Sequence, residues 1–127
     1  MKIEEQVLSI EQMKHLKELG VDTSDASMCW AGNDVVPNNG SAFDLGYDGI
    51  PTYTTGDLIE KLPKIIGDYR LLIDWDSEIV YYQDWSGEEV LDHIGEYSFT
   101  DRPIVNTLYD CLCWVAQTHK ELLEVKK

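Results

Sequence analysis

A long amphipathic helix near the end of the chain constrains the fold more than any other feature of the sequence. Asp101 occupies a helix N-cap position, and Pro103 falls inside the first turn, where its missing N–H has no bond to lose. The apolar residues that follow are spaced by 4, 3, 1 and 3, which places them on one helix face: Ile104, Leu108, Cys111, Leu112 and Val115. A face of this length needs a cover, and an antiparallel sheet is the simplest one.

Strands for this sheet are predicted as two hairpins. Residues 69–75 and 79–85 are rich in β-branched and aromatic residues and flank a polar turn, which predicts one hairpin. Residues 28–31 predict another strand, and the turn signal PNNG at residues 37–40, before residues 41–47, predicts a first hairpin.

Residues 90–97 fit either a third strand beside the second hairpin or a short helix, and the strand is favoured. Two short helices are also indicated. A capping box that begins at Ser9, with Gly20 at the stop position, predicts a helix over residues 9–19. A second N-cap at Thr54 opens a helical stripe that Pro63 closes.

These elements predict an α+β fold. Its four- or five-stranded antiparallel sheet packs on the long C-terminal helix, with the two short helices alongside. A chain of 127 residues, with 43% hydrophobic residues, is expected to form a single globular domain over residues 1–127.

The charge of the chain excludes some partners. There are 24 acidic and 10 basic residues, a net charge of −14, which repels nucleic-acid backbones and anionic membrane surfaces. Residues 22–110 hold 18 of the acids against Lys61, Lys64, Arg70 and Arg102, so this segment carries the whole net charge. Its acidic surface either keeps the protein in solution or meets a basic partner.

Cysteine and histidine usage indicates a reducing compartment and no catalytic site. The first residues, MKIEEQVLSI, show no secretory signal pattern, so we expect a cytoplasmic protein. Three cysteines, an odd number, do not fit a disulfide framework. Cys111 is expected to pack in the core. The three histidines have no zinc-binding spacing.

The segment IDWDSEIVYYQDW is the strongest candidate for a metal site. Asp74, Asp76 and Glu78 match three ligand positions of a calcium loop, but Ile79 and Trp85 stand where that loop needs glycine and a bidentate glutamate. In a tight hairpin, the carboxylates of Asp74 and Glu78 diverge to opposite faces of the sheet. A solvated turn is therefore favoured, and no cofactor is expected.

The same hairpin is a candidate partner-binding surface. Consecutive strand residues point to opposite faces, so one of Tyr81 and Tyr82 cannot reach the core. An exposed aromatic residue ringed by carboxylates suits a protein partner better than an enzyme pocket. The candidate partner-binding residues are Asp74, Asp76, Glu78, Tyr81, Asp84 and Trp85.

Four segments together resemble a set of small proteins of unknown function carried by prophages and mobile elements of gut bacteria. They are DTSDASMCW, IPTYTTGDLIEKLPK, YRLLI with IVYY, and LYDCLCWVAQ, and the resemblance runs from about Ser9 to Gln117. It brings no functional residues with it. It implies a mobile element in a bacterial cytosol, where small acidic proteins often act on host proteins.

The sequence therefore favours a non-enzymatic, acidic protein-binding module of a phage or mobile element. One alternative is a DNA mimic that inhibits a nucleic-acid-binding protein. The other is a small metal-dependent enzyme that uses Asp74, Asp76 or Glu78.

Overall fold

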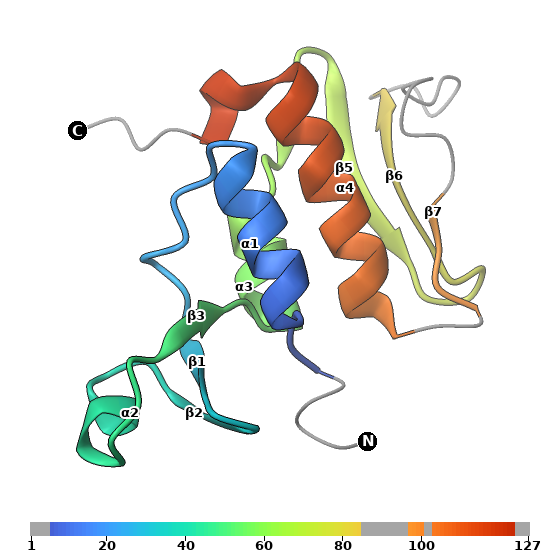
Figure 1. Ribbon diagram of the computed structural model, residues 1–127. Coiled ribbons are helices and arrows are strands. Elements are labelled where there is room, and N and C mark those ends of the chain that lie inside the picture. Colours follow the sequence, from blue (N-terminus) through green and yellow to red (C-terminus); the bar gives the residue numbers. More distant parts are fainter. Residues whose placement is uncertain (1–5, 85–96, 101–102, 124–127) are drawn as a thin grey trace.

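A computed structural model describes residues 6–84, 97–100 and 103–123 and shows an α+β fold (Figure 1). The helices are α1 (Ile10–Glu18), α2 (Ser41–Asp44), α3 (Thr55–Lys61), α4 (Ile104–Thr118) and the 3₁₀ helix η2 (Lys120–Leu123). The strands are β1 (Met28–Ala31), β2 (Asp34–Pro37), β3 (Ile50–Thr52), β4 (Ile65–Ile66), β5 (Tyr69–Asp74), β6 (Ile79–Asp84) and β7 (Tyr97–Ser98).

The strands form two antiparallel sheets, so the prediction of one four- or five-stranded sheet is wrong. One sheet has the order β2-β1-β3, and the other has the order β4-β5-β6-β7, in which β4 and β7 are only two residues long. The two sheets have separate hydrophobic contacts. Strand β6 contributes Val80 and Tyr82 to the main core, whereas Cys29 and Ala31 of β1 belong to a second, smaller cluster.

The first hairpin is shorter than predicted. Strand β1 matches the prediction, but its partner is β2, and Ala31 pairs with Asp34 across a two-residue turn. The predicted partner strand over residues 41–47 is wrong, because this segment contains the helix α2. The turn at Gly32 and Asn33 is of the kind that two-residue hairpins favour. It lets Val35 and Val36 of β2 pair with β1.

The second hairpin is confirmed. Strands β5 and β6 pair from Tyr69–Asp84 to Asp74–Ile79, across a turn that is longer than the tight connection at Asp76 and Ser77. Asp74 stabilises this turn, because its Oδ1 accepts hydrogen bonds from the backbone N–H groups of Asp76 (3.0 Å) and Ser77 (3.1 Å). Of the predicted third strand, Tyr97 lies in β7, which pairs with β6, and residues 90–96 lie outside the described residues.

The two short helices begin where the sequence predicts. Ser9 and Gln12 form a complete capping box at α1, and Thr54 and Asp57 form one at α3. The long helix is confirmed, but its N-cap is Pro103 and not Asp101, which lies outside the described residues.

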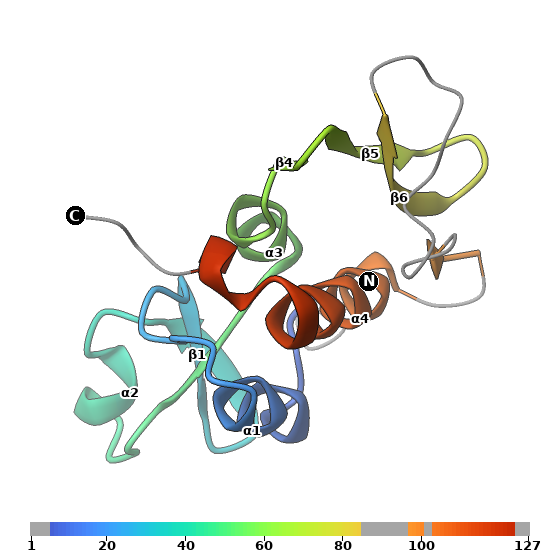
Figure 2. The same ribbon diagram turned by 90° about the horizontal axis from the view of Figure 1, so that it is seen from above.

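Helix α4 lies at the centre of the molecule. Figures 1 and 2 place α1 and α3 on one side of it and the sheet of β5 and β6 on the other. The main core joins these elements through fully buried side chains such as Leu16 of α1, Leu58 of α3 and Val80 of β6. Within the part of the chain that the structure describes, no helix has the length and apolarity needed to span a bilayer.

Candidate protein-interaction surface

Three large apolar side chains are exposed on and just after α2. Phe43 is 81% exposed, Leu45 60% and Tyr47 48%. We call these three residues the α2 patch. The largest apolar patch on the surface of a monomeric protein is often functional.

Helix α2 buries a small side chain and exposes a large one, whereas a helix that stabilised the fold would bury its large apolar side chains. The small residue Ala42 points inward and is 4% exposed, whereas Phe43 points outward. Ala42 packs with Cys29 and Ala31 of β1, and Val36 of β2 packs against them. The small core under α2 therefore contains small side chains, and the large ones face the solvent.

The backbone holds the α2 patch in one conformation. The N–H of Tyr47 donates to the carbonyl of Ala42 (2.9 Å), and the N–H of Gly46 donates to the carbonyl of Phe43 (2.9 Å). With Gly46 at φ +89°, these two bonds make a Schellman motif that ends α2. The ring of Tyr47 also lies against Gly32 in the β1–β2 turn, since a Cβ added there would approach the ring within 3.0 Å. The backbone path through the patch and the ring of Tyr47 are thus held in place before binding.

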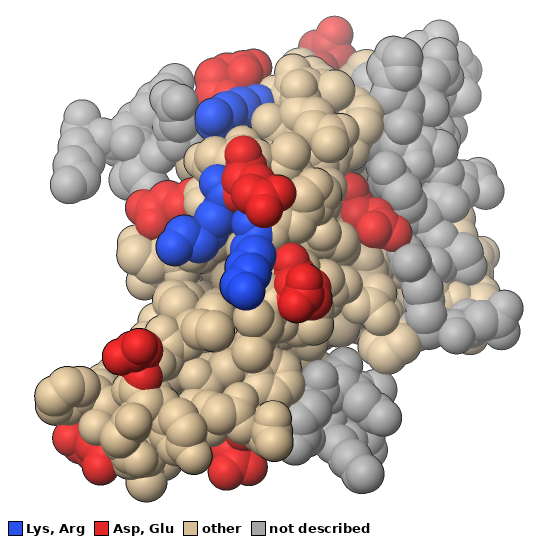
Figure 3. All heavy atoms as spheres, in the orientation of Figure 1, with Lys and Arg blue, Asp and Glu red and all other residues tan. Residues whose placement is uncertain are grey.

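The only charged side chains near the patch in the sequence are carboxylates. Residues 18–60 contain eight acidic residues and no Lys or Arg. Asp44 lies between Phe43 and Leu45, Asp48 follows Tyr47, and Asp34 begins β2. In Figure 3 the lobe that carries α2, at the lower left, shows acidic side chains and no basic ones on the visible face.

The predicted site residues on the second hairpin do not share one surface. The register places Asp74 and Tyr81 on one face of the sheet, and alternation puts Asp84 with the buried Tyr82 on the other. Asp76 and Glu78 lie in the turn. Tyr81 keeps partial exposure, as predicted for one of the two tyrosines, and Trp85 lies outside the described residues.

Sequence reasoning missed Trp75 at the tip of this hairpin. Its side chain is 62% exposed and makes an edge-on contact with Phe99, with ring centroids 5.6 Å apart. Trp75 looked like the last residue of a strand, but β5 ends one residue earlier, at Asp74. The hairpin tip is therefore a second exposed aromatic site, but with one large side chain where the α2 patch has three.

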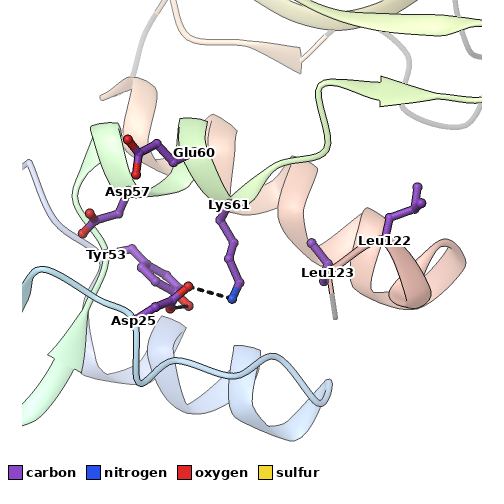
Figure 4. A pocket seen from close by; sticks show the side chains of 7 residues that line it. All are labelled: Asp25, Tyr53, Asp57, Glu60, Lys61, Leu122 and Leu123. Carbon is purple, nitrogen blue, oxygen red and sulfur yellow. Dashed lines mark hydrogen bonds and ion pairs between the residues drawn. The ribbon is translucent and has the colours of Figure 1, made fainter. Parts of the chain in front are cut away.

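A hollow of about 360 Å³ lies between the residue 22–27 segment, α3 and η2 (Figure 4). The hollow brings together parts of DTSDASMCW and IPTYTTGDLIEKLPK, two of the segments that resemble the prophage proteins. The side chain of Lys61 is 8% exposed, and its ammonium group binds Asp25 Oδ2 at 2.9 Å. The hydroxyl of Tyr53 lies 2.7 Å from Asp25 Oδ1, and Asp57 Oδ2 accepts three hydrogen bonds, from the backbone and hydroxyl of Ser27 and the N–H of Thr54.

These contacts give the hollow a structural role. Burial, the hydrogen bond to Asp25 and the surrounding carboxylates raise the pKa of Tyr53, so its hydroxyl stays protonated and remains a donor. The most deeply placed polar groups bind one another and join the segment before β1 to α3. We assign no ligand to this hollow.

Helices α1 and α4 bring a thiol, an imidazole and a phenol together. His15 Nδ1 lies 2.7 Å from Tyr109 Oη and 3.9 Å from Cys113 Sγ. Burial raises the pKa of the Cys113 thiol, and the hydrogen bond with Tyr109 offsets this only in part. Burial also raises the pKa of Cys111 to about 12. Neither thiol has the lowered pKa of a catalytic nucleophile.

The described residues contain no group of three or more His, Cys, Asp or Glu side chains placed to hold a metal ion. The cysteines at 29, 111 and 113 are free thiols, as expected. Comparison of the chain with protein-family models, curated proteins and solved structures finds no match.

Proposed function

We propose that this chain is a non-enzymatic module that binds another protein, and that the α2 patch is the centre of its contact surface. The observation that carries the proposal is the inverted packing at α2. Phe43 is 81% exposed while Ala42 beside it is buried, so the large side chain contributes little to folding.

The size and order of the patch support this role. Together the three side chains expose on the order of 300 Å² of apolar surface, comparable to the largest, often functional, patches of small monomeric proteins. The Schellman motif fixes the path of the chain before binding, so less conformational entropy is lost on association. Aromatic side chains in the centre of an interface commonly carry most of its binding energy.

The resemblance indicates where to seek the partner. The wild-type chain, immobilised on beads, is incubated with lysate of a gut bacterium, and retained proteins are identified by mass spectrometry. The test variant carries Phe43→Ser and Leu45→Ser. The control variant carries Ile65→Ser, which removes an apolar side chain that is 51% exposed on β4.

We expect at least one protein to bind the wild type and the control, and to bind the test variant at least about tenfold more weakly, the loss typical of a central contact residue. The purified protein then gives dissociation constants for all three chains. Thermal unfolding checks that the test variant is folded.

The hairpin site is the rival, and Trp75→Ser tests it in the same assay. If Trp75→Ser abolishes retention and the test variant keeps it, the contact surface is the hairpin tip with Asp74 and Asp76, and the α2 proposal is wrong. If no protein depends on either surface, the protein-binding function itself fails.

A further inference from the structure

We infer that the partner presents an apolar groove bordered by Lys and Arg side chains, into which the α2 patch inserts. This inference rests on the proposed function and adds the chemistry of the partner. It is carried by three features of the patch: its unpaired carboxylates, its shape and the charge of the chain around it.

Among the residues that the structure describes, the carboxylates beside the patch have no counter-ions. Over the described residues, the side chains of Asp34, Asp44 and Asp48 make neither a hydrogen bond nor an ion pair, and all three residues are exposed. By contrast, Asp25 binds Lys61, and Asp22 and Asp57 accept hydrogen bonds from nearby Ser residues. The carboxylates of the 18–60 segment that lack partners thus include those that flank the patch.

A partner that covers the patch must compensate the negative charge of these carboxylates. Asp44 lies between two patch residues in the sequence, so any surface that covers Phe43 and Leu45 also removes water from its neighbourhood. Removing water from a carboxylate without supplying a cation is strongly unfavourable. Lys or Arg side chains around the partner's apolar site satisfy this requirement and speed the encounter.

The shape of the lobe defines the geometry of the partner. In Figures 1 and 2 the segment that carries α2 extends away from α4 and the main core, and Figure 3 shows it as a projection. A projecting patch with Phe43 at 81% exposure fits a concave surface better than a flat one.

The same charges disfavour other occupants. A second copy of the chain carries a further net charge of −14 and the same three carboxylates, so self-association through this patch brings like charges together. Nucleic acids and anionic membranes are repelled for the same reason.

The test uses the protein captured in the lysate experiment, purified, and follows its association rate with the chain by stopped flow. The test variant carries Asp34→Asn, Asp44→Asn and Asp48→Asn. The matched control carries Glu11→Gln, Asp68→Asn and Glu121→Gln, exposed acids outside the lobe, so both variants change the net charge equally.

With the wild type, we expect the association rate to fall about tenfold when salt rises from about 50 to about 300 mM, because screening shortens the range of the attraction. At low salt the test variant should associate about fivefold more slowly than the wild type and depend less on salt, whereas the control should change less than about twofold.

Equal slowing by both variants, or a rate that ignores salt, overturns the inference of a basic groove. If retention still depends on Phe43 and Leu45 in that case, the protein-binding function stands and only the chemistry of the partner is wrong. Sedimentation of the free chain gives a further check, since a dimer that Phe43→Ser dissociates would make a second copy the occupant.

Discussion

At the scale of single residues, the ionisable groups buried beside α4 contribute stability that depends on pH. Cys111 is fully buried, and its pKa rises to about 12 because burial, and then the charge of Asp110, disfavour the thiolate. Burial also raises the pKa of Tyr82, whose hydroxyl donates to the Pro63 carbonyl at 2.7 Å. These groups must stay neutral in the folded chain.

This predicts a loss of stability at alkaline pH. The pKa of Cys111 is higher in the folded than in the unfolded chain, so its contribution is complete below the ordinary thiol pKa and is lost as the pH rises toward 12. At about pH 10 the loss from Cys111 alone should be about 1–2 kcal/mol. Urea unfolding of the wild type between about pH 7 and pH 10 measures it.

Cys111→Ala removes the ionisable group, so its unfolding free energy should fall less with pH than that of the wild type, by about 1 kcal/mol at about pH 10. The control is Leu112→Ala, a neighbouring buried residue that does not ionise. It should lower stability by about 2–4 kcal/mol at every pH and keep the wild-type pH dependence. Identical pH slopes in all three proteins would contradict the assignment to Cys111.

At the scale of elements, the end of α2 depends on one glycine. Gly46 has φ +89°, which ends the helix and sets the positions of Leu45 and Tyr47. A Cβ at Gly46 would meet no atom within 4 Å, so a substitution there acts through backbone strain alone. Gly56, inside α3, has no positive φ, and a Cβ there makes only an ordinary contact with Thr54.

The two glycines predict opposite effects for the same change. Gly46→Ala should lower the free energy of unfolding by about 1 kcal/mol and weaken partner binding, because the Schellman motif is strained. Gly56→Ala should raise it by up to about 1 kcal/mol, since alanine loses less conformational entropy than glycine in a helical conformation, and should leave binding unchanged. Thermal unfolding of both variants measures the difference. A stabilising Gly46→Ala would show that α2 ends in another way.

The elements that local chemistry defines were predictable from the sequence. The capping boxes at Ser9 and Thr54 lie within one helical turn, and α1 and α3 begin where these boxes place them. The second hairpin was predictable because its two strands are adjacent in the chain and similarly patterned. The first hairpin was not: both β2 and the segment 41–47 follow β1 closely, and the PNNG turn favoured the wrong one.

The same ambiguity hid the candidate site. Phe43, Leu45 and Tyr47 alternate with Asp44 and Gly46, which is the pattern of a half-buried strand. In the structure this alternation belongs to a short helix and the turn after it, and its apolar side faces the solvent. Gly46 was the available signal, since glycine is poor inside a strand and common just after a helix.

At the scale of the whole molecule, the buried surface of α4 is too wide for one sheet to cover. The sequence showed one apolar stripe on this helix, but its buried residues also include Val105, Trp114 and Ala116, which widen the buried surface beyond one face. A sheet on one side cannot cover such a helix. Helices α1 and α3 cover the rest, and β1, β2 and β3 form a separate sheet under α2.

The net charge lowers the stability of the folded chain, whereas its proposed effect on the binding of a basic partner is favourable. With 24 acidic and 10 basic residues, at least 14 carboxylates cannot have a cation of their own within the chain. Folding brings these charges closer together, and the resulting repulsion lowers the stability of the compact state. Salt weakens that repulsion, so it should stabilise the fold while it slows association with a basic partner.

We therefore expect the melting temperature to rise by a few degrees, equivalent to about 1 kcal/mol, when sodium chloride is raised from about 10 to about 150 mM. Sucrose at matched osmolarity separates screening from general solvent effects. The variant that carries Asp34→Asn, Asp44→Asn and Asp48→Asn has three fewer charges and should gain less from salt than the wild type. A melting temperature that falls with salt would mean that attractive pairs such as Lys61–Asp25 outweigh the repulsion.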